Sequence, residues 1–201
     1  MNLPNKITLA RVFLAITVLF ILIFPFHEVG FSWPRYLIAG RILVDLRYIV
    51  CGVLFVIAAI TDYLDGYIAR TRNIVTNFGK VMDAIADKIL VNGLLIILAF
   101  DGFLPVIIPV VVITRDIITD SIKSLAGSKG STVPASLLGK IKTIFMLVGI
   151  SLVLFYNFPA SLLGTGFALG NYLIFIATVL SVFSGVQYYQ ANKKFIYDSD
   201  I

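Results

Sequence analysis

Long apolar segments recur along the whole chain, and they constrain its fold more than any other feature. A helix needs about 20 residues to cross a hydrocarbon core of about 30 Å. With 59% hydrophobic and 13% charged residues, the chain has little polar sequence left for a water-soluble domain. We therefore expect an all-α integral membrane protein with six transmembrane helices, forming a single transmembrane domain over residues 1–201. The predicted helices are Ile7–Phe26, Tyr48–Arg70, Phe78–Phe100, Leu104–Leu125, Leu138–Tyr156 and Leu169–Tyr189.

The basic residues predict how these helices are oriented. An even number of spans places both termini on one side of the membrane, and of the 16 lysines and arginines only Arg35, Arg41 and Arg47 fall on the other side. Cytoplasmic loops are enriched in Lys and Arg, so both termini are expected to be cytoplasmic. The short loops and the lack of a targeting extension favour a bacterial plasma (cytoplasmic) membrane. No basic stretch is interleaved with exposed aromatics, so we expect no nucleic acid partner.

The residue types in the chain exclude several chemistries. Cys51 is the only cysteine, which rules out an internal disulfide and a thiolate zinc cluster. His27 is the only histidine, so neither a histidine metal site nor a Ser-His-Asp triad is expected. Glu28 is the only glutamate among the 11 acidic residues. Any catalysis therefore depends on aspartates, which are ligands that hard divalent cations prefer.

Four aspartates are spaced so that they can form one site. Asp62 and Asp65 are three residues apart, and Asp83 and Asp87 are four apart, so each pair lies on one face of its helix. If the two helices fold back on each other near residue 74, all four carboxylates reach a similar depth. This depth is on the side that carries the basic residues, and the site is therefore predicted at the cytoplasmic side.

Clustered carboxylates beside a membrane need compensating cations, because each costs about 2.5–3.5 kcal/mol at the centre of a membrane helix. Two divalent ions, Mg²⁺ or Mn²⁺, are one solution. Ion pairs with Arg70, Lys80 and Lys88 are the other. Gly66 and Gly79 interrupt these helices, which indicates either close approach of a nucleotide or helix packing through small residues.

The stretch from Asp62 to Asp87 resembles the signature of the CDP-alcohol phosphatidyltransferase family. That signature is D-x-x-D-G-x-x-A-R, eight further residues, and G-x-x-x-D-x-x-x-D. The matching positions are Asp62, Asp65, Gly66, Ala69, Arg70, Gly79, Asp83 and Asp87. The resemblance implies the family's six-helix architecture. It also implies attack by an alcohol on the lipid-side phosphorus of a CDP-linked lipid, with CMP as the leaving group.

The same resemblance implies roles for individual residues and a homodimer. The metal ligands would be Asp62, Asp65, Asp83 and Asp87. Asp87 is also the candidate general base that takes the proton from the acceptor hydroxyl. Contacts to the CDP-lipid are expected from Asn5, Thr8, Gly66, Arg70 and Thr76. From the residues alone, Asn5 can equally be a helix N-cap.

Three further segments are similar to the branch of the family that takes sn-glycerol 3-phosphate as acceptor and CDP-diacylglycerol as donor. They are Leu3–Arg11, Thr114–Asp116 and Gly139–Thr143; a departure is Ala84, where that branch usually has proline. A phosphorylated acceptor needs a cationic pocket. Its predicted residues are Arg115, Lys140 and Lys142, which can also be read as ordinary positive-inside residues. We expect Asp116, Asp120 and Lys123 to form a solvated ionic patch.

Other functions stay open at this stage. The acceptor can be an inositol phosphate, or phosphatidylglycerol, which would give cardiolipin. A divalent-cation transporter is an alternative of another class, because intramembrane aspartates also mark ion paths. A transporter would distribute acidic residues across the bilayer, whereas the last two predicted helices contain none.

Overall fold

The computed structural model describes residues 3–38, 40, 42–71, 77–128, 137–158, 160 and 168–197. Within these ranges, the side chains of 3–6, 65, 67–70, 77–78, 80, 128 and 194–197 lie outside the description. The described chain contains six α-helices, as predicted. They are α1 (Leu3–Ile23), α2 (Leu46–Thr71), α3 (Asn77–Phe100), α4 (Ile107–Ser128), α5 (Leu137–Leu154) and α6 (Leu169–Tyr197).

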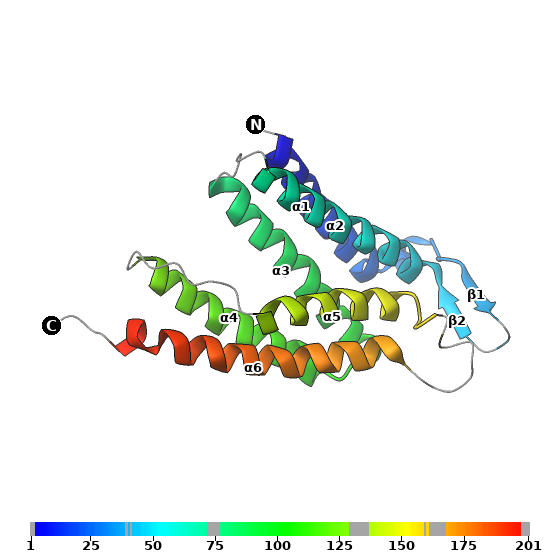
Figure 1. Cartoon of the computed structure of the whole chain (residues 1–201). Coiled ribbons are helices and arrows are strands. Elements are labelled where there is room, and N and C mark those ends of the chain that lie inside the picture. The colour runs from blue at the N-terminus through cyan, green and yellow to red at the C-terminus, as the bar shows by residue number, and fades with distance from the viewer. Residues whose placement is uncertain are drawn as a thin grey trace.

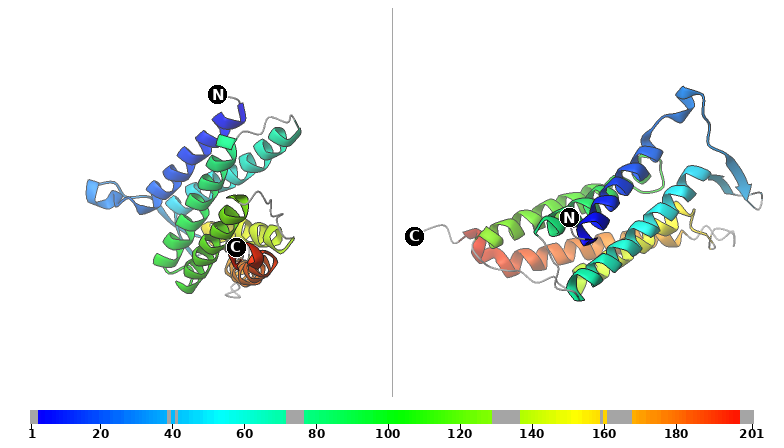
Figure 2. Two further views of the ribbon diagram at one scale, coloured as in Figure 1. Left: turned by 90° about the vertical axis from the view of Figure 1, so that its left-hand side faces the viewer. Right: turned by 90° about the horizontal axis from the view of Figure 1, so that it is seen from above.

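The helical architecture is confirmed, but the connection between α1 and α2 contains a short hairpin that was not predicted. That connection holds a 3-10 turn (Phe26–Val29) followed by an antiparallel hairpin of β1 (Arg35–Ile38) and β2 (Ile42–Asp45). Aromatic and branched side chains favour the extended backbone of both strands. Gly40 takes a left-handed φ of 65° between them, which glycine adopts without steric cost. The hairpin projects beyond the helix ends (Figure 2).

The helices form two groups of three (Figure 1). In the first, α1 packs against both α2 and α3; in the second, α6 packs against both α4 and α5. Contacts of α2 with α5 and of α3 with α4 join the two groups. The start of α1, the end of α2 and the start of α3 lie at one end of the first group (Figure 1). This arrangement places residues that are far apart in the sequence side by side.

One apolar core runs through both groups. Phe55, Leu94, Leu98 and Ile150 are at most 1% exposed within it. The tightest helix contact joins α5 and α6 at Gly149 and Gly170. A Cβ on Gly149 would lie 2.6 Å from the side chain of Ile174, and one on Gly170 would lie 2.8 Å from the carbonyl oxygen of Gly149. Small residues allow the backbones to approach this closely, as is common for helices in membranes.

Three described helices are long and apolar enough to cross a membrane: Leu46–Leu64, Leu137–Leu154 and Leu169–Lys193. Ile7–Ile23 is a shorter apolar helix within the described residues. The remaining helices carry their charged residues over part of their length, at 80–88 in α3 and at 115–123 in α4. Each helix from α1 to α5 contributes a charged side chain to the cavity described below.

Candidate active site

A cavity of about 180 Å³ lies between the two helix groups. Residues of α1, α2, α3, α4 and α5 line it, so both groups contribute to its walls. Apolar side chains such as Phe55 and Met146 line part of the cavity. Its charged lining residues are Arg11, Asp62, Asp87, Lys88, Asp116 and Lys142. Opposite charges from distant parts of the sequence therefore face one small space.

The first wall of the cavity is formed by α1, α2 and α3, and on it Arg11 pairs with two of the described carboxylates. The guanidinium Nη1 of Arg11 donates to Asp62 Oδ1 at 2.5 Å and to Asp83 Oδ1 at 3.3 Å. The hydroxyl of Thr8 donates to the same Asp83 oxygen at 2.9 Å. The Arg11 side chain is only 2% exposed, whereas the side chains of Asp62 and Asp83 are 42% and 41% exposed. Arg11 and Asp62 line the cavity, while the half-exposed carboxylate of Asp83 pairs with Arg11 from outside the lining.

The helix packing explains this cluster. Thr8 and Arg11 are three residues apart and lie on the same face of α1, the helix that packs against both α2 and α3. Because α2 and α3 run in opposite directions, Asp62 near the end of one meets Asp83 near the start of the other. A buried arginine is stable only when its charge is paired, and these two aspartates supply the pairing.

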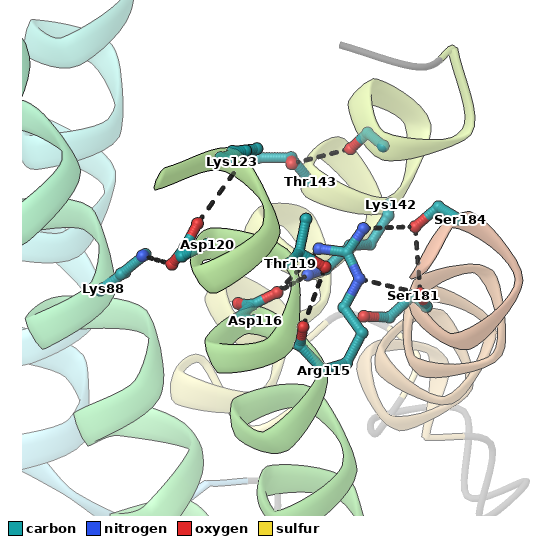
Figure 3. A network of polar contacts seen from close by, with 11 residues as sticks. Lys88, Arg115, Asp116, Thr119, Asp120, Lys123, Lys142, Thr143, Ser181 and Ser184 are labelled. Carbon is teal, nitrogen blue, oxygen red and sulfur yellow. Dashed lines mark hydrogen bonds and ion pairs between the residues drawn. The ribbon is translucent and has the colours of Figure 1, made fainter. Parts of the chain in front are cut away.

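On the second wall, one carboxylate serves two cations (Figure 3). Asp116 Oδ1 accepts hydrogen bonds from Lys142 Nζ at 2.8 Å and from Arg115 Nη1 at 2.9 Å. Lys142 is buried and lines the cavity. Asp116 is half-buried rather than solvated, which corrects the prediction of an ionic surface patch at this residue. The cause is that α4 and α5 both pack against α6, which lets the side chain of Lys142 reach Asp116.

Arg115 reaches away from the cavity towards α6. Its Nε donates to the carbonyl oxygen of Ser181 at 3.0 Å, and its Nη2 donates to Ser184 Oγ at 2.7 Å (Figure 3). Gly185 makes room for this side chain, because a Cβ there would lie 3.0 Å from Arg115 Cγ. Arg115 thus links α4 to α6 through hydrogen bonds, while its Nη1 donates to the carboxylate of Asp116.

A further ionic contact crosses between the two groups. Lys88 of α3 pairs with Asp120 of α4 (Figure 3). Lys123 lies 3.7 Å from the same carboxylate and 5.8 Å from the ring centroid of Tyr188. The side chains of Lys88, Asp120 and Lys123 are 37% to 54% exposed, so water screens these pairs and each contributes little stability.

The predicted site residues are only partly brought together. Asp62 and Asp83 meet at Arg11, and Asp87 lines the same cavity as Asp62. Of the predicted phosphate-binding residues, Lys142 lines the cavity, Arg115 contacts α6, and Lys140 is exposed near the start of α5. Of the predicted CDP-lipid contacts, Thr8 binds Asp83 and Gly66 lies one turn beyond Asp62. The side chains of Asp65, Asn5 and Arg70, and Thr76 as a whole, lie outside the described residues.

Comparison with known proteins identifies the family of this chain. The sequence profile of CDP-alcohol phosphatidyltransferase matches residues 1–183. The chain belongs to the CDP-alcohol phosphatidyltransferase family. It is 38% identical over 191 residues to the CDP-diacylglycerol–glycerol-3-phosphate 3-phosphatidyltransferase of Bacillus subtilis, covering 95% of both chains. It is 36% identical to the Mycoplasma genitalium protein of that name, covering 96% of this chain and 86% of the relative. The Rickettsia felis protein of that name is 31% identical, with 96% and 97% covered.

The donor set of this family member fits divalent metal ions. Asp62 and Asp83 come from two helices and already share one cation, and their carboxylates are half-exposed. Carboxylate oxygens are the ligands that Mg²⁺ and Mn²⁺ prefer. Among the side chains that the structure describes, no three acidic, histidine or cysteine residues are gathered tightly enough to hold a metal ion. Asp65 is not among those side chains.

Arg11 is the site residue that the sequence reasoning missed. Arg70, Lys80 and Lys88 were the alternative to metal ions as partners of the aspartates, and of these only the side chain of Lys88 is described. In the structure Lys88 pairs with Asp120, while Asp62 and Asp83 pair with Arg11. A signal was present in the sequence, because Arg11 is the one charged residue within the apolar segment Ile7–Ile23 and lies one turn from Thr8. Its partners depended on which helices pack together, and the spacing within one helix does not contain that information.

Proposed function

We propose that this protein transfers a phosphatidyl group from CDP-diacylglycerol to sn-glycerol 3-phosphate, which gives phosphatidylglycerophosphate and CMP. The observation that carries the proposal is the cavity with two unlike walls. Asp62 and Asp87 supply negative charge on one side, and Lys142 supplies positive charge on the other. A metal-bound diphosphate suits the first wall and an anionic acceptor suits the second. The names of the relatives support this choice of donor and acceptor.

In the proposed reaction, a hydroxyl oxygen of the acceptor attacks the phosphorus that carries the diacylglycerol. The bond from that phosphorus to the CMP oxygen breaks, and CMP leaves with the electron pair. Asp87 takes the hydroxyl proton as general base. Lys142 binds the acceptor phosphate, and Asp116 fixes the position of Lys142 through their 2.8 Å contact. The apolar part of the cavity limits the access of water to the reacting atoms.

Asp62, Asp65, Asp83 and Asp87 would hold two divalent ions, Mg²⁺ or Mn²⁺. When bound, these ions supply Lewis-acid stabilisation of the diphosphate charge. Arg11 pairs with both Asp62 and Asp83 and fixes their positions relative to each other. We place Asn5, Thr8, Gly66, Arg70 and Thr76 near the nucleotide, and Arg115 and Lys140 near the acceptor phosphate as supports of Lys142. Thr8 supports this assignment through its contact with Asp83.

The membrane arrangement is proposed on the same basis. We expect six spans in a bacterial plasma membrane, with both termini and the cavity on the cytoplasmic side. The helix count and the basic residues of the sequence support this topology. The whole chain would act as a single domain, and as a homodimer.

The decisive experiment uses purified protein with CDP-diacylglycerol, Mn²⁺ and a panel of acceptors. The acceptors are sn-glycerol 3-phosphate, glycerol, inositol phosphate and phosphatidylglycerol, and the lipid products are then separated. We expect phosphatidylglycerophosphate and stoichiometric CMP with the first acceptor alone. A lipid product from inositol phosphate or phosphatidylglycerol, with none from sn-glycerol 3-phosphate, would contradict the proposed acceptor and leave the reaction class intact.

A further inference from the structure

A second polar cavity lies at the other end of the first helix group, between the 3-10 turn, the hairpin and the start of α2. Its volume is about 440 Å³. We call it the outer pocket. The residues used below are His27, Trp33, Arg35, Asp45 and Arg47, all of which line it. None of them belongs to the candidate active site.

The charges in the outer pocket favour an anion. Asp45 is its one acidic lining residue within the described chain, and two guanidinium groups surround it. Arg47 contacts both carboxylate oxygens at 2.9 to 3.2 Å, and Arg35 Nε lies 3.4 Å from Oδ2. The Arg35 side chain is 61% exposed. Arg47 interacts with the charges of both Asp45 and Asp101. The exposed guanidinium of Arg35 is therefore the group that has donors left for a ligand.

A buried donor without a partner gives a second, independent indication of a ligand. The indole Nε1 of Trp33 is buried and has no hydrogen-bond acceptor. The ring is fixed against Phe26 and Phe31, with centroid distances of 5.6 Å and 5.5 Å. Buried N–H groups in proteins are nearly always paired with protein, water or ligand atoms. An anion in the outer pocket would provide the missing acceptor.

The position of the outer pocket indicates the source of that anion. The apolar segment Leu46–Leu64 begins directly after Asp45. Asp62 follows Asp45 by 17 positions, which is roughly 25 Å of helix at 1.5 Å per residue, close to the thickness of a hydrocarbon core. The outer pocket therefore lies at the membrane boundary opposite to the candidate active site, at the level of lipid headgroups.

The hairpin beside the outer pocket has an apolar surface suited to a bilayer. Tyr36, Leu37 and Leu43 are 57%, 63% and 57% exposed, and Leu37 is paired with Leu43 across the two strands. At a membrane boundary these side chains can contact acyl chains, while the arginines contact headgroups. Free phosphate would use the arginines alone and would not account for this exposed apolar surface.

We propose that the outer pocket binds the phosphate group of a membrane phospholipid through Arg35, Arg47 and the indole N–H of Trp33. His27, which also lines the outer pocket, can add a further donor to the same group. This lipid is distinct from the substrate, because the candidate active site lies at the other end of α2. Its binding anchors the connection between α1 and α2 at the bilayer surface.

The test uses Trp33 as its own reporter, since the chain contains one tryptophan. Full-length protein in a non-ionic maltoside detergent is titrated with short-chain phosphatidylglycerol, with short-chain phosphatidylcholine and with inorganic phosphate, and Trp33 emission is recorded. We expect a saturable change with phosphatidylglycerol at a concentration about tenfold or more below that needed for inorganic phosphate. If inorganic phosphate saturates at the same concentration as the lipid, the lipid assignment is overturned.

Paired variants identify the contacts. Arg35→Gln should raise the half-saturating lipid concentration about tenfold, as expected for the loss of one charge-assisted hydrogen bond. Lys193→Gln removes an equal charge from an exposed position on α6 and should leave the titration unchanged. Trp33→Phe is followed by the lipid-induced rise in melting temperature, which should shrink. No saturable response to any phosphate compound, or identical titrations of Arg35→Gln and the parent protein, would overturn the proposal.

Discussion

The two walls of the cavity are ionic clusters of opposite composition. In the first helix group, one buried arginine, Arg11, serves the two carboxylates of Asp62 and Asp83. In the second group, one carboxylate, Asp116, serves the two cations of Arg115 and Lys142. Among these side chains the first cluster has one carboxylate in excess and the second has one cation in excess, although Arg115 and Asp83 lie outside the cavity lining. In a low-dielectric setting, such charges act strongly on a ligand between them.

This difference indicates how one cavity can handle two anionic substrates. A metal-bound diphosphate is attracted to the first wall and a phosphorylated acceptor to the second, so the two substrates bind on opposite sides. In each cluster, the single residue of opposite charge has a positioning role. Arg11 holds two carboxylates together, and Asp116 holds Lys142 against α4. Substitutions of the ligand-binding residues in a cluster should therefore have different effects from substitutions of its positioning residue, Arg11 or Asp116.

The largest effect is expected from the carboxylates of the first wall. Asp62→Asn, Asp65→Asn and Asp83→Asn should each abolish measurable turnover, a loss of about a thousandfold or more, because metal ions contribute several kcal/mol to transition-state stabilisation. Mn²⁺ binding, measured by electron paramagnetic resonance, should weaken in parallel. Asp120→Asn is the matched control and should keep activity near that of the parent protein. Near-normal turnover in any of the three variants would disprove the metal assignment.

The two proposed roles of Asp87, metal ligand and general base, can be separated by experiment. Asp87→Asn should reduce kcat by about 10²–10⁴-fold even at full metal occupancy, because an amide cannot accept the hydroxyl proton. The measurement is a metal titration at saturating CDP-lipid and acceptor, with occupancy recorded beside the rate. Recovery of the parent kcat at full occupancy would leave Asp87 as a ligand only.

On the second wall, the expected effect is confined to the acceptor. Lys142→Met should raise the KM for sn-glycerol 3-phosphate about tenfold or more, with little change in the KM for the CDP-lipid, because it removes a charge-assisted contact. Arg115→Ala should act in the same direction by releasing Asp116. Lys140→Met should have a smaller effect, since Lys140 is exposed. Equal increases in both KM values would indicate general structural damage instead.

Arg11, the single cation of the first cluster, should contribute more to stability when no metal ion is bound than when one is bound. Arg11→Met removes the cation shared by Asp62 and Asp83, and the metal-free protein should lose about 1–3 kcal/mol, the cost of leaving a buried polar partner unsatisfied. Because both carboxylates are about 40% exposed, the lower end of that range is expected. Mn²⁺ should restore part of the melting temperature that Arg11→Met loses. Arg11→Lys keeps the charge, so its melting temperature should fall less and rise less with Mn²⁺. A melting temperature that does not depend on metal in either variant would contradict this role of Arg11.

The smallest effect concerns Asp45, which lies far from both walls. Burial opposes ionisation of this carboxyl, but hydrogen bonds from Arg47 and the charges of Arg47 and Arg35 outweigh it and lower its pKa. Its contribution to stability is therefore present above the unfolded-state pKa of about 3.9 and is lost as the pH falls through the lower folded-state value. In acid unfolding followed by circular dichroism, the free energy of unfolding of Asp45→Asn should fall less steeply below about pH 4 than that of the parent protein. An acid limb as steep as that of the parent protein would contradict this assignment.

The sequence by itself determined the number of helices, their approximate bounds and the aspartate pairs on α2 and α3. Apolar length and helical spacing are local properties, so residues such as Asp62 and Asp83 could be placed on faces without knowledge of the packing. The short strands between α1 and α2 were missed, because a few residues of branched and aromatic character do not reveal a pairing partner.

Only the tertiary structure decided which charges meet. Arg11 lies 51 positions from Asp62, and Lys142 lies 26 positions from Asp116. Whether such residues are in contact depends on which helices pack together and on their rotation about their axes. The same applies to Arg115, whose side chain turned towards α6 because Gly185 leaves room there. Charge and spacing are encoded along the chain, whereas the pairing of buried charges arises from packing between helices, and packing also brought carboxylates and cations of distant helices to one cavity.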